Sequence, residues 1–412
     1  MNAYEIIEQA EKELVESGVF KRVEQIAFYN QKKVMDAFRE FRVSETYFAA
    51  SSGYGYNDKG RDELEKIYAK VFEAESALVR HTLTSGTHTL AVGLFGLLRP
   101  GDTLLSVTGK PYDTLEEVIG IRGDEGNGSL RDFGVKYAQI EMKDGSVDVQ
   151  AVTEYLKKDD SVKVVFLQRS KGYSVRKTLS SEEIGEIVKL VKSINSEIFV
   201  AVDNCYGEFC DEHEPTYYGA DLIMGSLIKN PGGGMAETGG YLVGTAKAVE
   251  LCAYRHTCPG IGAEGGATLG QNKNMYKGLF YAPHTVCQSI KTALLAAKVY
   301  ENLGYQTYPK ATDERHCIIQ TISLKTREKL LDFCSGIQSG SPVDSYVAPV
   351  PYAMPGYADE VIMAAGAFTQ GSSIELSADA PCKEPYTVYL QGGLTYESGK
   401  IGIMYAVIGT EK

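Results

Sequence analysis

A lysine in a glycine-rich turn has the clearest potential for chemistry in this chain. Lys229 lies in the segment GSLIKNPGGG, residues 225–234, directly after the apolar run ADLIM of residues 220–224. Burying a lysine costs free energy, and glycines let the backbone approach a bound group closely. The segment is therefore either an exposed loop or a turn that presents Lys229 and Ser226 to a ligand. A lysine kept neutral by desolvation is a nucleophile that forms Schiff bases with aldehydes.

A second segment has the composition of a phosphate site. Ser85, Gly86 and Thr87 follow a predicted strand over 76–83 and open a predicted helix over 87–98. Free N–H groups at a helix N-terminus, small hydroxyl side chains and the helix dipole together attract anions. The same residues also make an ordinary helix cap, so this segment alone leaves both interpretations open.

An acid closes a third predicted strand. Asp203 follows the apolar residues IFVAV of 198–202, which places it at the carboxyl edge of the expected sheet. There it could hold the protonated ring nitrogen of a heteroaromatic cofactor through a charge-assisted hydrogen bond. The alternative is an aspartate that caps the next turn.

The order of these three features predicts pyridoxal 5′-phosphate. This cofactor needs a phosphate clamp, an acid at its pyridinium nitrogen and a lysine that traps its aldehyde. Residues 85–87, Asp203 and Lys229 supply these groups in chain order, the lysine 26 positions after the acid (229 − 203). A side chain must also stack on the ring. Tyr112, in the segment GKPYDTL after the next predicted strand, is the best candidate.

Alternating strand and helix patterns position these residues. Short apolar runs predict strands at 76–83, 102–107, 162–168, 198–203 and 221–226, and helical patterns occupy 62–73, 87–98 and 180–194. Continuously apolar strands that alternate with helices predict an α/β fold whose mainly parallel sheet is covered by helices. Ligands of such sheets bind beyond the carboxyl ends of the strands.

The chain divides into three predicted regions. Residues 1–60 form an N-terminal helical arm, residues 61–285 form the large cofactor-binding domain, and residues 286–412 form a smaller C-terminal α+β domain. The last region opens with a long helical pattern at 284–304 and continues with shorter mixed elements.

Composition excludes several classes of function. A net charge of −12 over 412 residues argues against nucleic acid or an anionic membrane as a partner. The N-terminus lacks an apolar signal core and no stretch approaches the roughly 20 apolar residues of a membrane span, so a cytoplasmic location is expected. Eight cysteines are too sparse for a disulfide framework, and the cluster Cys252, His256 and Cys258 lacks the partner pair of a metal site. No metal site is predicted.

With these motifs in place, the chain resembles the fold-type-I pyridoxal-phosphate enzymes of cysteine and methionine metabolism. Within them it is most similar to the branch of aluminium resistance or methionine γ-lyase-like proteins. The resemblance runs from about residue 50 to the C-terminus. It is carried by ELEKIYAKVFEAESALVRHTLTSGTHTLAVGLFGLLRPGD, by VAVDNCY and by YYGADLIMGSLIKNPGGG.

The resemblance implies a role for each matching residue. It places Lys229 as the Schiff-base lysine, Asp203 on the pyridine nitrogen and Tyr112 over the ring. The phosphate would be held by Ser85, Gly86, Thr87 and Ser226. A tyrosine and an arginine of the family reach the phosphate of a neighbouring subunit, and the matches here are Tyr54, Tyr56 and Arg61. The resemblance thus implies a homodimer or homotetramer with a shared phosphate site, and an inter-subunit role for the segment up to residue 60.

Two departures from the family bear on the site. The loop after strand 162–168 reads QRSKGYS instead of carrying an asparagine at the cofactor hydroxyl, so Arg169 or Ser170 is expected to substitute. In the C-terminal domain, Tyr389 stands where the lyases place an arginine for the substrate carboxylate. Tyrosine cannot supply an ionic fork. Arg169, Lys171 and Lys383 are the candidates to replace it.

The function expected is a carbon–sulfur lyase that acts on a sulfur amino acid by β- or γ-elimination, with Lys229 as the base and Tyr112 as a proton shuttle. Another reaction of the same cofactor, by an aldolase, racemase or aminotransferase, is the first alternative. A non-catalytic metal-tolerance protein is the second. For that role the acidic run DEHE, 211–214, would be a candidate, but it is predicted to be a solvated surface loop.

Overall fold

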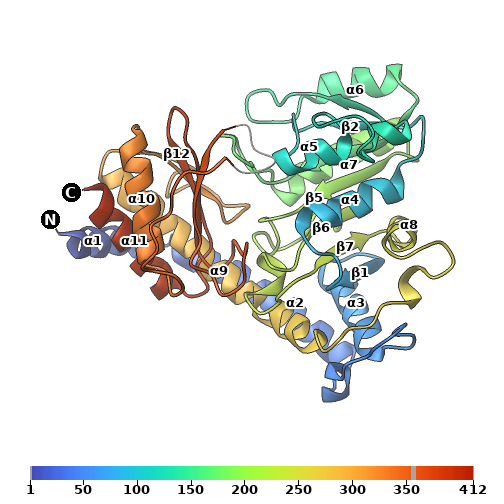
Figure 1. The fold of residues 1–412 in the computed structure, drawn as a ribbon, viewed down its shortest axis with the longest axis horizontal. Coiled ribbons are helices and arrows are strands. Elements are labelled where there is room, and N and C mark those ends of the chain that lie inside the picture. Colours follow the sequence, from blue (N-terminus) through green and yellow to red (C-terminus); the bar gives the residue numbers. More distant parts are fainter. Residues whose placement is uncertain (1, 354–358, 412) are drawn as a thin grey trace.

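Two sheets of unequal size organise the molecule. The computed structural model describes residues 2–353 and 359–411, and Figure 1 shows the larger sheet on the right and the smaller one on the left. The N- and C-termini lie together beside the smaller sheet. No helix in the described part of the chain is long and apolar enough to cross a membrane.

The larger sheet is mainly parallel, as predicted. Its described strands have the order β1-β7-β6-β5-β4-β2-β3. Of these, β7 alone runs in the opposite direction to the others. Its strands are β1 (Ser76–Arg80), β2 (Thr103–Ser106), β3 (Lys136–Gln139), β4 (Val162–Gln168), β5 (Phe199–Asp203), β6 (Leu222–Ser226) and β7 (Gly240–Gly244). The five predicted strands match β1, β2, β4, β5 and β6, while β3 and β7 were not predicted.

Helices cover both faces of this sheet. Successive residues of a strand point to opposite faces, and in these strands both are apolar. Leu104 and Val164 pack into one core, whereas the adjacent Leu105 and Val165 pack into the core of the opposite face. The helices of this part are α3 (Lys59–Val71), α4 (Gly86–Leu97), α5 (Asp113–Ile119), α6 (Val149–Lys158), α7 (Ser181–Ile194) and α8 (Ala246–His256). Ser180 caps α7 in a full capping box, as its sequence predicts.

The smaller sheet is antiparallel and has the order β10-β11-β12-β9-β8. Its strands are β8 (Gln306–Tyr308), β9 (Gln320–Ser323), β10 (Val361–Ala364), β11 (Ser377–Pro381) and β12 (Thr387–Gln391). Two helices, α10 (Arg327–Ser339) and α11 (Tyr396–Thr410), pack against each other beside this sheet.

Long helices tie the two parts together. The N-terminal α1 (Ala3–Ser17) and α2 (Val19–Glu40) both pack on α9 (Asn272–Asn302), which runs diagonally from the smaller sheet to the foot of the larger domain in Figure 1. The helix α9 begins 12 residues before the predicted start at 284 (284 − 272). The two domains therefore share a helical spine, and the site lies where their sheets face each other.

Candidate active site

Three strand ends bring the predicted residues together. Gln168, Asp203 and Ser226 are the last residues of β4, β5 and β6, which are neighbours in the sheet. Gln168 and Asp203 are direct partners across the β4–β5 ladder. Since these strands run parallel, their carboxyl ends lie at one edge, and the site forms there.

Lys229 lies at the centre of this edge. It follows β6 by three residues and lines a cavity together with Asp203, Tyr112 and Ser170. The Nζ atom lies 3.9 Å from the centroid of the Tyr206 ring, so the ammonium sits over an aromatic face. The turn therefore presents Lys229 inward, and the exposed-loop interpretation is wrong.

The protonation state of Lys229 differs from the expectation. Burial alone would lower its pKa, but the acidic groups of Cys205, Tyr206 and Asp203 outweigh burial and raise the pKa above the usual value. The sequence-based expectation of a neutral amine is corrected here, because it counted desolvation and not the acids around the lysine. Lys229 must give up a proton before it can act as a nucleophile.

Asp203 is a buried acid next to this cation. The residue is 6% exposed, and its Oδ1 accepts a hydrogen bond of 3.1 Å from the Cys205 N–H. Burial raises the pKa of Asp203, while the charge of Lys229 and the Cys205 hydrogen bond act in the opposite direction. A carboxylate in this position could pair strongly with a protonated ring nitrogen, since little water competes for it.

The N-terminus of α4 forms the third side of the site. Ser85 is the N-cap of this helix, and its side chain accepts a hydrogen bond from the His88 N–H. A Cβ atom on Gly86 would lie 3.6 Å from Ser226 Cβ and 3.7 Å from Cys205 Sγ. The helix terminus therefore meets the end of β6 and Cys205, where N–H groups and hydroxyls could hold an anion. The Thr87 hydroxyl is also close to another hydroxyl, 2.7 Å from that of Thr114.

Tyr112 is positioned from the neighbouring strand end. Its N–H donates to Gln168 Oε1 at 2.7 Å, and its ring lines the Lys229 cavity. Gly172, at which a Cβ atom would lie in van der Waals range of Tyr112 Cδ2, has a φ of +54°, a backbone conformation that favours glycine. An amine, a buried acid, an anion-binding helix terminus and an aromatic ring thus converge, and this donor set fits pyridoxal phosphate.

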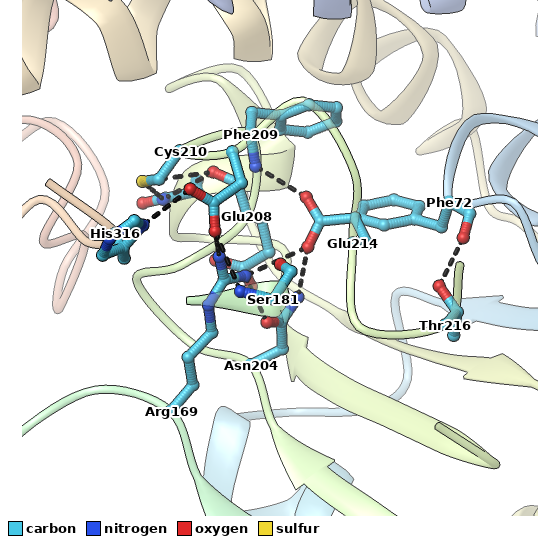
Figure 2. A network of polar contacts seen from close by, with 12 residues as sticks. Phe72, Arg169, Ser181, Asn204, Glu208, Phe209, Cys210, Glu214, Thr216 and His316 are labelled. Atoms are coloured by element: carbon cyan, nitrogen blue, oxygen red, sulfur yellow. Dashed lines mark hydrogen bonds and ion pairs between the residues drawn. The ribbon is translucent and has the colours of Figure 1, made fainter. Parts of the chain in front are cut away.

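Arg169 does not belong to this set. Its side chain is fully buried on the far side of the β4 end, where it donates to Asn204 and forms ion pairs with Asp211 at 2.7 Å and Glu214 at 3.2 Å. Figure 2 shows the guanidinium enclosed by this network. The prediction that Arg169 contacts the cofactor is corrected, because the ion pairs occupy its guanidinium. Its predicted alternative, Ser170, lines the cavity.

Asp211 and Glu214 of the acidic run 211–214 belong to the same network, whereas Glu212 between them is exposed, so the prediction of a solvated loop is only partly right. Glu214 is 1% exposed and also accepts from the Phe209 N–H at 2.8 Å. Asp211 accepts from His316 at 2.7 Å and from the Ser181 N–H at 3.0 Å (Figure 2). The charges of Asp211 and Glu214 therefore act inside the fold.

We expect the Asp211 interactions to give a measurable acid dependence of stability. Burial raises the pKa of Asp211, but His316 and Arg169 outweigh it and lower the pKa to about 2. The stabilisation should be complete above about pH 4, the ordinary range of an aspartate, and should decline as the pH falls toward 2. Urea denaturation of wild type and Asp211→Asn should therefore show a difference in unfolding free energy that narrows between about pH 4 and pH 2. A difference that widens in acid would contradict this assignment.

Three further predicted residues lie away from the cavity. Tyr54 and Tyr56 are 78% and 52% exposed, and their rings stack with centroids 5.7 Å apart. Arg61 is buried, and its guanidinium donates to the carbonyls of Gly55 and Gly266 at 2.7 and 2.8 Å. Within this chain, Arg61 therefore holds the loop that displays the two tyrosines.

Residues of the smaller domain close the cavity, and most of them were missed. Tyr389 lines it from β12, at the position where the related lyases place an arginine, and Asp379 lines it from β11. Gln391 donates to Asp379 Oδ2 at 2.8 Å, and burial raises the pKa of Asp379 to about 6. A lone acid within the strand SADAP was the available signal. Among the described residues that line the cavity there is no arginine, and Tyr389 and Asp379 lie there on β12 and β11.

Comparison with known proteins places this geometry in a family. The family model for methionine gamma-lyase matches residues 3–410. The chain belongs to the methionine gamma-lyase family. This is a family of pyridoxal-phosphate enzymes, in agreement with the amine, acid and anion site described above.

Relatives of this methionine gamma-lyase family member cover nearly the whole chain. The uncharacterized protein YnbB of Bacillus subtilis is 52% identical over 95% of this chain and 93% of its own length. The crystal structure of a carbon-sulfur lyase involved in aluminum resistance from Clostridium novyi NT is 50% identical, with a TM-score of 0.94 over 98% of this chain and 95% of that one. The predicted resemblance to the branch of aluminium resistance or methionine γ-lyase-like proteins is thereby confirmed.

A distant structure shows the same fold. The pyridoxal-5′-phosphate dependent protein YhfS from Escherichia coli is 15% identical, with a TM-score of 0.62 over 94% of this chain and 96% of its own. At that identity the likeness shows the fold alone. It confirms the predicted fold-type-I architecture.

Proposed function

We propose that the protein is a pyridoxal-phosphate-dependent carbon–sulfur lyase that acts on a sulfur amino acid by β- or γ-elimination. The observation that carries this proposal is the convergence of Lys229, Asp203 and the α4 N-terminus at neighbouring strand ends. The family match over residues 3–410 supports it. The carbon-sulfur lyase activity in the name of the Clostridium novyi relative supports the same reaction class.

Each residue has a task that follows from its position. When bound, pyridoxal phosphate supplies an electron sink conjugated to the α-carbon of the substrate. Lys229 would hold the cofactor covalently and, once displaced by the substrate amine, would take the proton from the α-carbon. Asp203 would keep a proton on the ring nitrogen. Residues 85–87 and Ser226 would hold the phosphate, and Ser170 would replace the family's asparagine.

Tyr112 is proposed to orient the cofactor ring and to move a proton to the leaving sulfur. Tyr112→Phe keeps the ring but removes the hydroxyl, so we expect kcat to fall about 100-fold or more with cofactor affinity unchanged. Steady-state kinetics and cofactor titration measure the two effects. The matched control is Tyr155→Phe, which removes a hydroxyl on α6, outside the cavity, and should leave kcat within about threefold. Equal kcat values for the two variants would exclude a proton-transfer role.

The products distinguish this function from other reactions of the same cofactor. Incubation with L-methionine, L-cystathionine, L-cysteine and L-homocysteine should release a keto acid, ammonia and a thiol or hydrogen sulfide in equal amounts from at least one of them. An aminotransferase would need an amino acceptor, an aldolase would release glycine from an added β-hydroxy amino acid such as L-threonine, and a racemase would form the opposite enantiomer. Formation of any of these without thiol release would overturn the lyase proposal.

The assembly is also a proposal. Tyr54 and Tyr56 are exposed as a stacked pair, which suits a contact with the phosphate of a neighbouring subunit in a homodimer or homotetramer. Mixing Tyr56→Ala and Lys229→Ala subunits tests the sharing, because a hybrid dimer would contain one site free of both substitutions. Activity restored on mixing would support a shared site, and a sum of the separate activities would oppose it.

A further inference from the structure

An uncompensated lysine lies in the loop between β4 and α7. Lys171 is 1% exposed, and its Nζ makes one long hydrogen bond of 3.4 Å to the Tyr308 carbonyl. The ammonium also lies 4.9 Å from the centroid of the Tyr308 ring. No carboxylate among residues 2–353 and 359–411 forms an ion pair with it. A buried ammonium without a counter-charge is unfavourable unless a ligand supplies one.

Two arginines near Lys171 also lack a carboxylate partner in the described part of the chain. Arg176 donates to the carbonyls of Gln168, at 2.8 Å, and of Ser170. Arg315, 7% exposed, donates to the Gln320 side chain at 2.6 Å and to the Lys310 carbonyl at 3.2 Å. All of these acceptors are neutral. Neither arginine makes an ion pair within the described part of the chain.

The lack of a carboxylate partner distinguishes this cluster from the other deeply buried arginines. The other deeply buried arginines of the described chain, Arg61, Arg80 and Arg169, are all paired with carboxylates: Asp62 at 2.8 Å, Glu65 at 2.6 Å and Asp211 at 2.7 Å. Burial and the charges of Arg315 and Arg176 lower the pKa of Lys171 to about 8, with only Cys317 acting in the other direction. In a chain with a net charge of −12, a buried cluster that lacks acids marks a place for an external anion.

The cluster opens toward the site of Lys229. Lys171 and Arg176 line a cleft of about 470 Å³ between the domains, bounded on the other side by the β10 and β11 ends. This cleft shares Tyr112, Gln168, Gly172 and Tyr173 with the Lys229 cavity. Among the described residues that line it, the inner cavity holds two carboxylates, Asp203 and Asp379, and no cation besides Lys229. Lys229 must bind the cofactor, so the inner cavity offers the carboxylate of an amino acid no ionic partner.

We infer that Lys171, supported by Arg176, binds a carboxylate of the amino-acid substrate in the interdomain cleft. The inference rests on the proposed function for the identity of the substrate as an amino acid. Lys171 thereby replaces the ionic contact that Tyr389 cannot make from β12. The carboxylate is either the α-carboxylate or one at the far end of the side chain, and the two are separated by matched ligands.

Three ligands without sulfur test the inference, because elimination cannot occur. L-Norleucine carries the α-carboxylate alone, L-2-aminoadipate replaces its terminal methyl with a second carboxylate, and pentylamine lacks both. Each is titrated into the cofactor-loaded protein by calorimetry. We expect Lys171→Met to weaken the binding of at least one carboxylate ligand by about 10- to 100-fold and to leave pentylamine binding unchanged.

The pattern of losses decides the outcome. Equal weakening of norleucine and aminoadipate assigns Lys171 to the α-carboxylate, and weakening of aminoadipate alone assigns it to a distal carboxylate. No weakening of either ligand, or equal weakening of pentylamine, overturns the inference. Because sulfur chemistry is absent, the result stands apart from the lyase assay: carboxylate-dependent binding with no thiol release would sink the proposed function and not the role of Lys171.

Two variants separate this role from a structural one. Lys383→Met removes a cation from the same cleft, but Lys383 is already paired with Asp359 at 2.5 Å, so ligand affinity should change less than about threefold. Lys171→Arg keeps a charge and should retain more affinity than Lys171→Met. Without ligand, Lys171→Met should unfold at an equal or higher temperature than wild type, since it removes an unpaired buried charge. A clear loss of thermal stability would indicate a structural role.

Discussion

Lys229→Ala should leave a folded protein that no longer retains its cofactor and that turns over at least about 10,000-fold more slowly than wild type. The variant removes both the amine that would hold the cofactor aldehyde and the base that would take the α-proton. The measurements are the cofactor absorbance after dialysis and the rate of thiol release. Folding is checked by circular dichroism and the thermal midpoint.

Lys229→Arg is the matched control for the charge. Arginine keeps a cation beside Asp203 and over the Tyr206 ring, but it cannot lose its proton to become a nucleophile or a base. We therefore expect Lys229→Arg to be as inactive as Lys229→Ala, and to be the more stable of the two. Added methylamine should recover part of the Lys229→Ala rate, because a small free amine can replace the base. Activity within tenfold of wild type in either variant would show that the catalytic lysine lies elsewhere.

Charge loss at Lys229 should also affect its neighbour. The charge of Lys229 acts against burial on the pKa of Asp203, so removing it should raise that pKa further and favour the neutral acid. A neutral Asp203 is a weaker partner for a protonated ring nitrogen. The affinity of Lys229→Ala for added cofactor should therefore be lower than loss of the covalent bond alone would produce.

The strands and the residues at their ends could be predicted from the sequence because the signals are local. The run 162–168 matches β4 residue for residue, and Asp203 and Ser226 end their strands as expected. A short apolar run bounded by polar residues needs no knowledge of its neighbours. Parallel order then places the ends side by side, so the meeting of Asp203, Ser226 and Lys229 follows from topology.

Side-chain direction beyond the strand ends could not be predicted in this way. Ser170 lines the cavity while Arg169, one position earlier, points to the opposite side. Alternation along the chain makes a one-residue difference decisive, and the sequence alone does not fix where the alternation stops. The pKa of Lys229 was missed for a related reason, since it depends on Cys205 and Tyr206, which reach it only in the folded chain. Asp379 was missed because its position depends on the antiparallel pairing of β11 with β12. The sequence does not reveal the register of that pairing.

Arg169→Met should lower the free energy of unfolding by about 3–5 kcal/mol, the largest stability effect that we expect from a single substitution in this molecule. The variant removes the cation between Asp211 and Glu214 and leaves the Glu214 carboxylate, 1% exposed, without an ionic partner. The remaining hydrogen bonds from Asn204 and the Phe209 N–H do not neutralise its charge. Urea denaturation with the cofactor removed from both proteins measures the difference.

The control lies in the same loop. Lys177 forms an ion pair with Glu183 at 2.5 Å, but both side chains are largely solvated, at 47% and 35% exposed, so Lys177→Met should cost no more than about 1 kcal/mol. Cofactor binding separates the two possible roles of Arg169. A structural arginine predicts a destabilised protein that, where folded, binds the cofactor with wild-type affinity, because Arg169 does not line the cavity. A stable variant with weakened cofactor binding would instead support the contact with the cofactor that the loop sequence predicted for Arg169. The structural result is the expected one because Arg169→Met would leave the buried Glu214 carboxylate without a cation, whereas Asp211 would still be paired with His316.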